Sequence, residues 1–363
     1  MSEYDVQKTQ PGGIRPLECD SHHPIIAAID LGTNSCRLLV ARVNVAGVRT
    51  NYFRSRPKPL SWKVIDSFAK VVRLGEGLHN NDELSDEAID RAMEALVICR
   101  KKLNRYHLHS LRAVATEACR RAKNNHILVD RAKRELDLDI EVIDSDEEAS
   151  LALKGCSAML NPHVPYGIVF DIGGGSTEVI LVKLKRDGKR RPGYAVPFDV
   201  IDSISVPYGV VTTTEEVGMP LDTMESHEFL QARIFEELKG FVEKNNITQL
   251  IQNDELQITG SSGTVTTLAA FHLGLAQYER RLIDGMTISY EDLYSVIERI
   301  LTMTREERLE QANIGFSRAD YVLTGSNILK AICDALPIKT MRIADRGVRE
   351  GILIDLMLEV IRM

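Results

Sequence analysis

Two glycine-containing turns, each preceded by an aspartate, carry residue types that can hold a phosphate group. The first lies in AIDLGTNSCRLL and the second in FDIGGGSTEVIL, where Asp30 and Asp171 each end an apolar run. Turns of this composition can aim backbone N–H groups and hydroxyls at an anion, phosphate above all. A carboxylate beside such a turn can hold Mg²⁺, usually through water. The pattern therefore predicts two phosphate-binding turns, with Asp30 and Asp171 as partners of a hydrated metal ion.

The turns supply the first group of candidate phosphate ligands. These are Thr33, Asn34, Ser35, Gly173, Gly174, Gly175, Ser176 and Thr177. For one turn alone, an ordinary glycine hairpin is an equally good interpretation, but the repeated pattern of acid, apolar residue and glycine favours a phosphate site. Neither a P-loop nor a dinucleotide-binding fingerprint is present. TGSSGTVTTLAAF does not match a nucleophile elbow, and it predicts a third glycine turn that enters a helix.

Apolar periodicity places these turns in an α/β chain. Residues 24–43 and 166–184 each predict a strand, a turn and a second strand, and helical patterns follow both, such as residues 86–106. Two copies of one unit predict two similar domains that face each other. No Pro/Gly/Ser-rich linker separates the copies, so we expect a hinge near Asp144.

Composition narrows the class of protein. The 363 residues are 44% hydrophobic and 27% charged, as in soluble globular proteins, and no apolar run is long enough to span a membrane. The first 23 residues lack the apolar core of a signal peptide and predict a disordered lead. Six scattered cysteines without a CxxC pair argue for a reducing cytoplasm and against structural zinc. The net charge of −7 argues against broad nucleic-acid binding.

Two smaller features remain open. His107 and His109 form an HxH pair, which without further ligands occurs often by chance and gives little support to a metal site. The run KLKRDGKRR, residues 183–191, is strongly basic. It predicts either a solvated hairpin loop or a contact for an emerging polyanion.

Several motifs together resemble one family. AAIDLGTNSCRLLVA, VRLGEGL, VATEACRRAKN, IEVIDSDEEASLALKG, FDIGGGSTEVIL, TGSSGTVTTLAA and DRGVREGIL follow the order seen in exopolyphosphatases and guanosine pentaphosphate phosphohydrolases, the Ppx/GppA family. The resemblance covers roughly residues 25–361 and is closest to the short, two-domain form. It implies an actin-like ATPase fold, which is ribonuclease H-like, with a phosphate-binding cleft between domain I and domain II. Domain I would comprise residues 24–144 and the C-terminal helix 347–363, and domain II residues 145–346.

The resemblance also implies an activity and its partners. The protein would remove the terminal phosphate of inorganic polyphosphate processively with Mg²⁺, or with Mn²⁺ in its place. It would otherwise convert guanosine pentaphosphate (pppGpp) to ppGpp, and (p)ppGpp would be a possible inhibitor. A homodimer is also possible. The sequence does not decide which substrate dominates.

Roles follow for particular side chains. Glu148, the second Glu of the EEA motif, would be the catalytic base, whereas on the residues alone Ser145 and Glu148 also fit a capping box. Asp171 and Glu178 would position metal and water, although a strand-ending aspartate and a surface carboxylate are the alternatives. Three arginines are candidate phosphate ligands, because Arg matches phosphate with paired donors: Arg37, Arg120 and Arg318. Arg37 and Arg318 match positions that reach bound guanosine tetraphosphate in the family, and surface ion pairs are the alternative.

Three other classes of protein compete with a polyphosphate hydrolase. An ATP-dependent kinase or ATPase of the same fold would need an adenine pocket, which TGSSGTVTTLA does not resemble. A non-catalytic (p)ppGpp sensor would keep the turns but would not need a base, so the presence of Glu148 argues against it. A cytoskeletal or chaperone scaffold would be expected to bind ATP.

Overall fold

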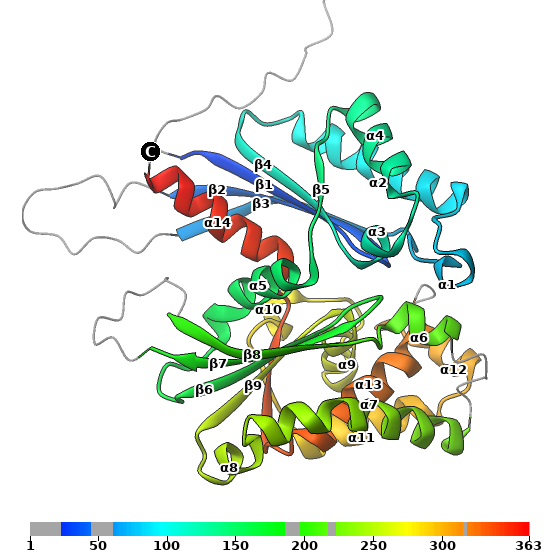
Figure 1. The fold of residues 1–363 in the computed structure, drawn as a ribbon, viewed down its shortest axis with the longest axis vertical. Helices are drawn as coiled ribbons and strands as arrows, with labels where there is room; N and C mark the ends of the chain where they lie inside the picture. The colour runs from blue at the N-terminus through cyan, green and yellow to red at the C-terminus, as the bar shows by residue number, and fades with distance from the viewer. Residues whose placement is uncertain (1–22, 45–60, 186–196, 217–222, 315–317, 363) are drawn as a thin grey trace, which may run out of the picture.

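A computed structural model describes residues 23–44, 61–185, 197–216, 223–314 and 318–362 (Figure 1). The predicted lead, apart from His23, lies outside these residues, and so does most of the basic run. Two lysines of the run are described. Lys183 lies over the ring of Tyr166 at 5.6 Å, and Lys185 pairs with Asp199 at 2.6 Å. A role of the whole run toward a polyanion stays a prediction.

The chain forms two mixed sheets of related topology (Figure 1). The first has the order β3-β2-β1-β4-β5, with β1 Ile25–Leu31, β2 Ser35–Asn44, β3 Ser61–Val71, β4 Leu108–Ala115 and β5 Ile140–Val142. The second has the order β10-β11-β9-β6-β7-β8, with β6 Tyr166–Ile172, β7 Thr177–Leu184, β8 Phe198–Val206, β9 Leu256–Ser261, β10 Thr287–Ser289 and β11 Thr340–Ala344. In both sheets three antiparallel strands continue into parallel ones. The predicted two-domain, actin-like α/β fold is confirmed.

The repeat extends to the atoms of the two turns. Asp30 pairs with Arg37 across β1 and β2, and Asp171 pairs with Glu178 across β6 and β7. The N–H of Gly32 donates to the carbonyl of Ser35 at 2.9 Å, and the N–H of Gly173 donates to the carbonyl of Ser176 at 2.8 Å. Each acid therefore lies two residues before a tight four-residue turn.

Helices cover the faces of both sheets and fill the ends of the molecule. Their bounds are α1 Leu78–Asn81, α2 Asp86–Leu103, α3 Glu117–Arg121, α4 Asn125–Leu136, α5 Ser145–Cys156, a 3₁₀ helix Ser157–Met159, α6 Val210–Glu216, α7 Met224–Lys244, α8 Ile247–Gln252, α9 Gly263–His272, α10 Arg280–Ile283, α11 Tyr290–Thr302, α12 Arg305–Glu310, α13 Tyr321–Ala335 and α14 Val348–Arg362. Helices α2 and α4 share a core with one face of the first sheet. Helices α7, α9, α11 and α13 bury the second sheet.

Two helices, α5 and α14, connect the sheets. Helix α14 follows β11 of the second sheet, yet Ile352 and Leu353 pack against the first sheet (Figure 1). Helix α5 contributes Leu151 to the same core and Leu153 to a core with β6 and β7. The predicted division at Asp144 falls between β5 and α5, and it stays a prediction because α5 packs against both sheets.

Candidate active site

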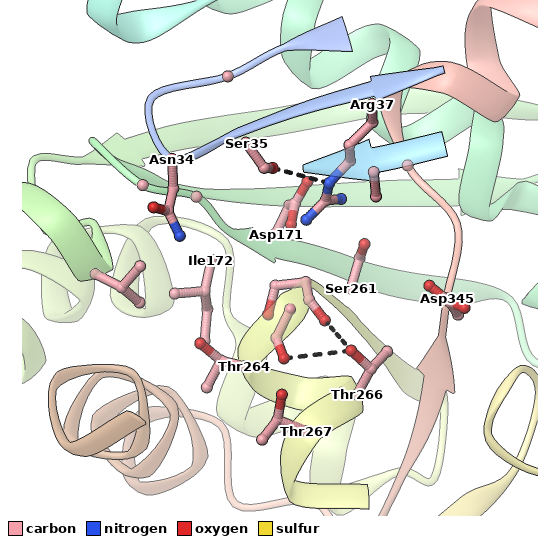
Figure 2. Close-up of a pocket in the computed structure, with 18 of the residues that line it drawn as sticks. Asn34, Ser35, Arg37, Asp171, Ile172, Ser261, Thr264, Thr266, Thr267 and Asp345 are labelled. Atoms are coloured by element: carbon pink, nitrogen blue, oxygen red, sulfur yellow. Dashed lines mark hydrogen bonds between the residues drawn. The ribbon is translucent and has the colours of Figure 1, made fainter. Parts of the chain in front are cut away.

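A cavity of about 760 Å³ lies between the two sheets and is lined by both glycine turns (Figure 2). The start of α9 and the loop between β11 and α14 complete its wall. Most of the predicted site residues line it: Asp30, Thr33, Asn34, Ser35, Arg37, Glu148, Asp171, Gly173, Gly174, Gly175, Ser176 and Arg318. Three predicted residues do not: Arg120, Thr177 and Glu178. The folded chain thus gathers most of the candidates into one cleft.

The second turn is glycine-rich because other parts of the protein approach its backbone. A Cβ on Gly174 would lie 2.8 Å from the Cβ of Thr33, and one on Gly175 would lie 2.2 Å from the Cγ of Glu117. None of the three glycines has a positive φ. From the sequence, we expected these glycines to let a ligand approach the backbone. The structure shows that Gly174 and Gly175 are already needed because residues of the other domain pack against them. Phosphate binding by the turn stays a prediction.

Partly buried carboxyl groups lie close to one another in the cleft. Burial raises the pKa of Asp171 to about 7, against the opposing effect of Arg37 and with a further increase from Glu148 and Asp30. Burial also raises the pKa of Asp30, which Arg37 and Arg349 partly oppose. Several acids that destabilise one another's charge in a cleft are typical of a site that binds a cation or moves a proton.

Glu148 belongs to this group, and it is not part of a helix cap. The N-cap of α5 is Asp144, whose side chain accepts a hydrogen bond from the N–H of Glu147 at 2.8 Å. The capping-box alternative with Ser145 is therefore wrong by one residue, because Asp caps as well as Ser does. Burial, followed by the charge of Glu178, raises the pKa of Glu148 to about 7, although Arg120 lowers it. A carboxylate with this pKa can accept a proton near neutral pH.

Arg120 does not line the cavity, but it forms a hydrogen bond with Glu148, which does. Its Nη1 donates to Oε2 of Glu148 at 2.7 Å and to the carbonyl of Ile143 at 3.0 Å, and its Nη2 donates to Glu117 at 2.9 Å. Because these partners occupy the guanidinium, the structure does not support the predicted role of Arg120 as a phosphate ligand. Arg120 is instead a positioning residue for the candidate base.

Glu178 and Thr177 also lie behind the turn. Oε1 of Glu178 accepts hydrogen bonds from the hydroxyls of Ser176 at 2.5 Å and Ser205 at 3.1 Å, and burial raises its pKa to about 7. Glu178 is 5% exposed, so it orients Ser176 rather than facing the cleft. The hydroxyl of Thr177 donates to the carbonyl of Tyr208 at 2.6 Å, so this side chain fixes the turn instead of offering a donor to a ligand.

The sequence pattern of the Ppx/GppA phosphatase family matches residues 55–360. The chain belongs to this family. Exopolyphosphatase 2 of Mycobacterium tuberculosis is 27% identical over 91% of this chain and 98% of that protein. A guanosine-5'-triphosphate,3'-diphosphate pyrophosphatase of Photobacterium profundum is 28% identical over 94% of this chain, which spans 61% of that protein.

Solved structures agree with the assignment. The Aquifex aeolicus member of the Ppx/GppA family superimposes with a TM-score of 0.70 at 26% identity, covering 93% of this chain and 98% of that one. An exopolyphosphatase-like protein superimposes with a TM-score of 0.75 at 30% identity, covering 92% and 98% of the two chains. Within the described ranges, every helix is too short or too polar to cross a membrane.

The cleft of this Ppx/GppA phosphatase contains residues that sequence reasoning did not assign. Nη1 of Arg318 donates to the hydroxyl of Thr267 on α9 at 2.8 Å. Nε of Arg37 donates to Ser35 at 3.0 Å (Figure 2). Five arginines line the cavity: Arg37, Arg280, Arg318, Arg346 and Arg349. Arg37 and Arg318 were predicted from the sequence, whereas Arg280, Arg346 and Arg349 were not. Arg346 and Arg349 belong to the recognised motif DRGVREGIL, but nothing in that motif showed that their side chains turn inward.

Proposed function

We propose that this protein is an exopolyphosphatase that removes terminal phosphates from inorganic polyphosphate in successive Mg²⁺-dependent steps. The observation that carries the proposal is the cleft, which is lined by two glycine turns, by several arginines and by a partly buried carboxylate, Glu148, with a pKa of about 7. Exopolyphosphatase 2 of M. tuberculosis, which this chain matches over nearly its full length, supports the substrate class. The scattered cysteines support a cytoplasmic location.

Each group of residues in the cleft would have a separate role in hydrolysis. Glu148 accepts the proton of the attacking water, while Arg120 keeps the carboxylate in place through its 2.7 Å hydrogen bond. The turns at 32–35 and 173–176 hold the terminal phosphate, and Arg37 and Arg318 balance its charge. Such positioning and charge stabilisation account for most of the catalysis of phosphoryl transfer. Protonation of Glu148 below pH 7 removes the base and lowers the rate.

The residues present fit Mg²⁺ held through water. Oδ1 of Asn34 is buried and has no hydrogen-bond partner in the described part of the chain, so it can accept from a metal-bound water. Asp30 and Asp171 carry raised pKa values that a cation would lower. Among the described residues, no three His, Cys, Asp or Glu side chains form a ready-made metal site, so substrate oxygens and water would complete the shell. When bound, Mg²⁺ neutralises charge on the phosphate oxygens, and Mn²⁺ could replace it.

A second substrate, pppGpp, is favoured by another part of the cavity wall. The cavity lining includes aromatic and apolar side chains that polyphosphate does not need, namely Tyr278, Ile314, Tyr321 and Val322. A guanine base could stack there while its 5'-phosphates reach the turns. The P. profundum relative supports this activity, which would link the protein to the stringent response. Product ppGpp, and pppGpp itself, would then inhibit polyphosphate cleavage by competition.

One assay tests the proposal against its alternatives. Phosphate release is measured from long-chain polyphosphate, pppGpp and ATP in parallel, with Mg²⁺ and with EDTA. We expect polyphosphate to be the best substrate, pppGpp to be cleaved more slowly, ATP to be nearly inert, and EDTA to stop all activity. Binding of ppGpp without release from any substrate would instead identify a sensor, and ATP as the best substrate would identify a kinase-like or scaffold ATPase.

A further inference from the structure

The five arginines of the cavity differ in whether the protein itself neutralises them. Arg280 pairs with Glu350 at 2.8 Å and with Asp345 at 3.4 Å, and Arg346 pairs with Asp284 at 2.9 Å. Arg37, Arg318 and Arg349 form no ion pair with any carboxylate of the described residues. They also lie close enough that Arg37 lowers the pKa of the other two, after the larger effect of burial. Burial of Arg318 and Arg349, together with the repulsion that each receives from Arg37, indicates that an anion belongs beside these cations.

Arg349 is the member of this group without a role in the proposed chemistry. It is the second residue of α14, the helix that follows β11 of the second sheet and packs on the first. The backbone just before it lies against the acidic side of the cleft, because a Cβ on Gly347 would be 3.8 Å from Oδ2 of Asp171 and 3.7 Å from Oγ of Ser261. Arg349 also lowers the pKa of Asp30. The start of α14 therefore lies beside Asp171, and it brings the guanidinium of Arg349 within electrostatic range of Asp30.

The natural partner of Arg349, its neighbour Glu350, is already engaged. Glu350 is 1% exposed, and its oxygens accept from Arg280 at 2.8 Å and from the N–H of Gly347 at 3.0 Å. These contacts anchor the first turn of α14 from the side of α10. They leave the guanidinium of Arg349 without a hydrogen bond to any described residue, although it lines the cavity. An arginine whose five donors have no protein partner in such a cavity is placed to receive a ligand.

We propose that Arg349 binds phosphoryl oxygens of the substrate, near Arg37 and Asp30, and so completes a three-arginine anion site with Arg318. This inference rests on the proposed function in one respect, that the ligand is a phosphate compound. It does not depend on which one, because polyphosphate and a nucleotide 5'-phosphate present the same oxygens. Since Arg37 comes from domain I, Arg318 from domain II and Arg349 from the helix that joins them, the ligand would contact all three parts.

The competing explanation is that Arg349 only balances the charges of Asp30 and Glu350. The two explanations differ in what the residue does to binding. As a counter-charge, Arg349 would affect stability and leave the affinity for phosphate chains unchanged. As a ligand, it would affect affinity directly, and Lys would replace it poorly because an ammonium lacks the planar pair of donors.

The test measures binding of tripolyphosphate by titration calorimetry, in a Glu148→Gln background and with EDTA, which together suppress turnover. We expect Arg349→Gln to weaken binding roughly 10- to 100-fold, as for the loss of hydrogen bonds to a charged group, and Arg349→Lys to restore part of it. The control is Arg342→Gln, which removes a hydrogen bond to the carbonyl of Met159 outside the cavity and should leave the affinity unchanged. Melting temperatures of all variants are measured in parallel.

Unchanged affinity in Arg349→Gln overturns the proposal, whatever happens to the melting temperature. If Arg349→Gln does not fold, Arg349→Lys decides, and an affinity equal to that of the parent overturns the proposal as well. A wild-type protein that releases no phosphate from polyphosphate would refute the proposed function. That result would leave the inference about Arg349 standing, because the binding assay requires no hydrolysis.

Discussion

At the scale of single residues, Glu148 and its surroundings set the expected pH dependence. Burial and the neighbouring acids raise the pKa of this carboxyl group, and the guanidinium of Arg120 partly lowers it again. Its pKa of about 7 makes it a usable base at neutral pH, whereas an ordinary exposed glutamate would be ionised but weakly basic. The cluster titrates as a unit, because Asp171 and Glu178 have pKa values near the same pH.

Glu148→Gln should lower kcat by roughly 10²- to 10⁴-fold while KM changes little, because the amide keeps the shape of the side chain but accepts no proton. The matched control is Glu147→Gln in the same helical turn. Glu147 points to Arg112, with which it pairs at 2.6 Å, and it does not line the cavity. Steady-state phosphate release from polyphosphate measures both. Near-normal turnover in Glu148→Gln, or an equal loss in both variants, would show that Glu148 is not the base.

Asp171 should make the metal-free protein less stable as the pH rises. Its pKa is about 7 when folded and 3.8 as the ordinary value, so the folded chain holds an extra proton between these values. The stability from this linkage is present below pH 3.8 and is lost as the pH rises through about 7. Asp171→Asn should therefore raise the melting temperature at pH 8, raise it less at pH 5, and increase the Mg²⁺ concentration needed for half-maximal rate.

Thermal melts at the two pH values and a Mg²⁺ titration of the rate check this expectation. The control is Asp199→Asn, which removes an exposed carboxylate from its pair with Lys185 and should give no such gain. A lower melting temperature for Asp171→Asn at pH 8 would contradict the charge argument. An unchanged Mg²⁺ titration would remove Asp171 from the metal site.

At the scale of secondary structure, the local patterns could be predicted and the contacts between distant elements could not. The two hairpins follow from apolar alternation and from acids at strand ends, which are local signals. The approach of Thr33 to Gly174 and the pair of Arg120 with Glu148 join segments far apart in the chain. No pattern within either segment encodes them. The position of the α5 cap was missed by one residue because adjacent Asp144 and Ser145 are both good caps.

The crossing of α5 and α14 offers a test at this scale. A Cβ on Gly351 would lie 2.0 Å from the carbonyl oxygen of Leu151, so Gly351→Ala must push the two helices apart. We expect a loss of about 1–3 kcal/mol in the free energy of unfolding, as for other overpacked sites. We also expect lower activity, since α14 carries Arg349. Chemical denaturation and phosphate release measure the two effects.

Gly240→Ala in α7 is the matched control for the same substitution within a helix. A Cβ there would meet no atom within 4 Å, and the residue is exposed. Because alanine favours helix, this variant should gain about 0.4–1 kcal/mol without a change in activity. Equal effects of the two substitutions would mean that the close crossing does not matter for stability.

At the scale of the whole molecule, the two domains touch where the glycine turns meet, at Thr33 and Gly174, and at both ends of the cleft. One end is the crossing of α5 and α14, which joins the sheets (Figure 1). At the other, Oε2 of Glu215 on α6 accepts from the N–H of Gly77 at 3.2 Å and lies 3.1 Å from Nδ1 of His79 on α1. Arg73 of the first domain also lies over the ring of Tyr321 of the second at 5.7 Å. The first end is continuous chain and packed core, whereas the second consists of a few polar contacts that can break and re-form.

This asymmetry predicts that the cleft opens at Glu215 and pivots at α5 and α14, as in hinge closure around a ligand. Glu215→Ala removes the acceptor for Gly77 and His79, so the ligand-free variant should show a larger radius of gyration than the wild type in small-angle scattering. Saturating tripolyphosphate in a Glu148→Gln background should bring both to the same compact value, because the ligand contacts turns on both domains. KM for polyphosphate should rise while kcat falls less, since the variant must close before it can react.

Glu236→Ala, which removes an exposed pair with Lys239 on α7, is the control and should match the wild type in every measurement. Identical scattering of wild type and Glu215→Ala, with and without ligand, would show that the cleft is rigid and that the contacts of Glu215 do not govern access to it.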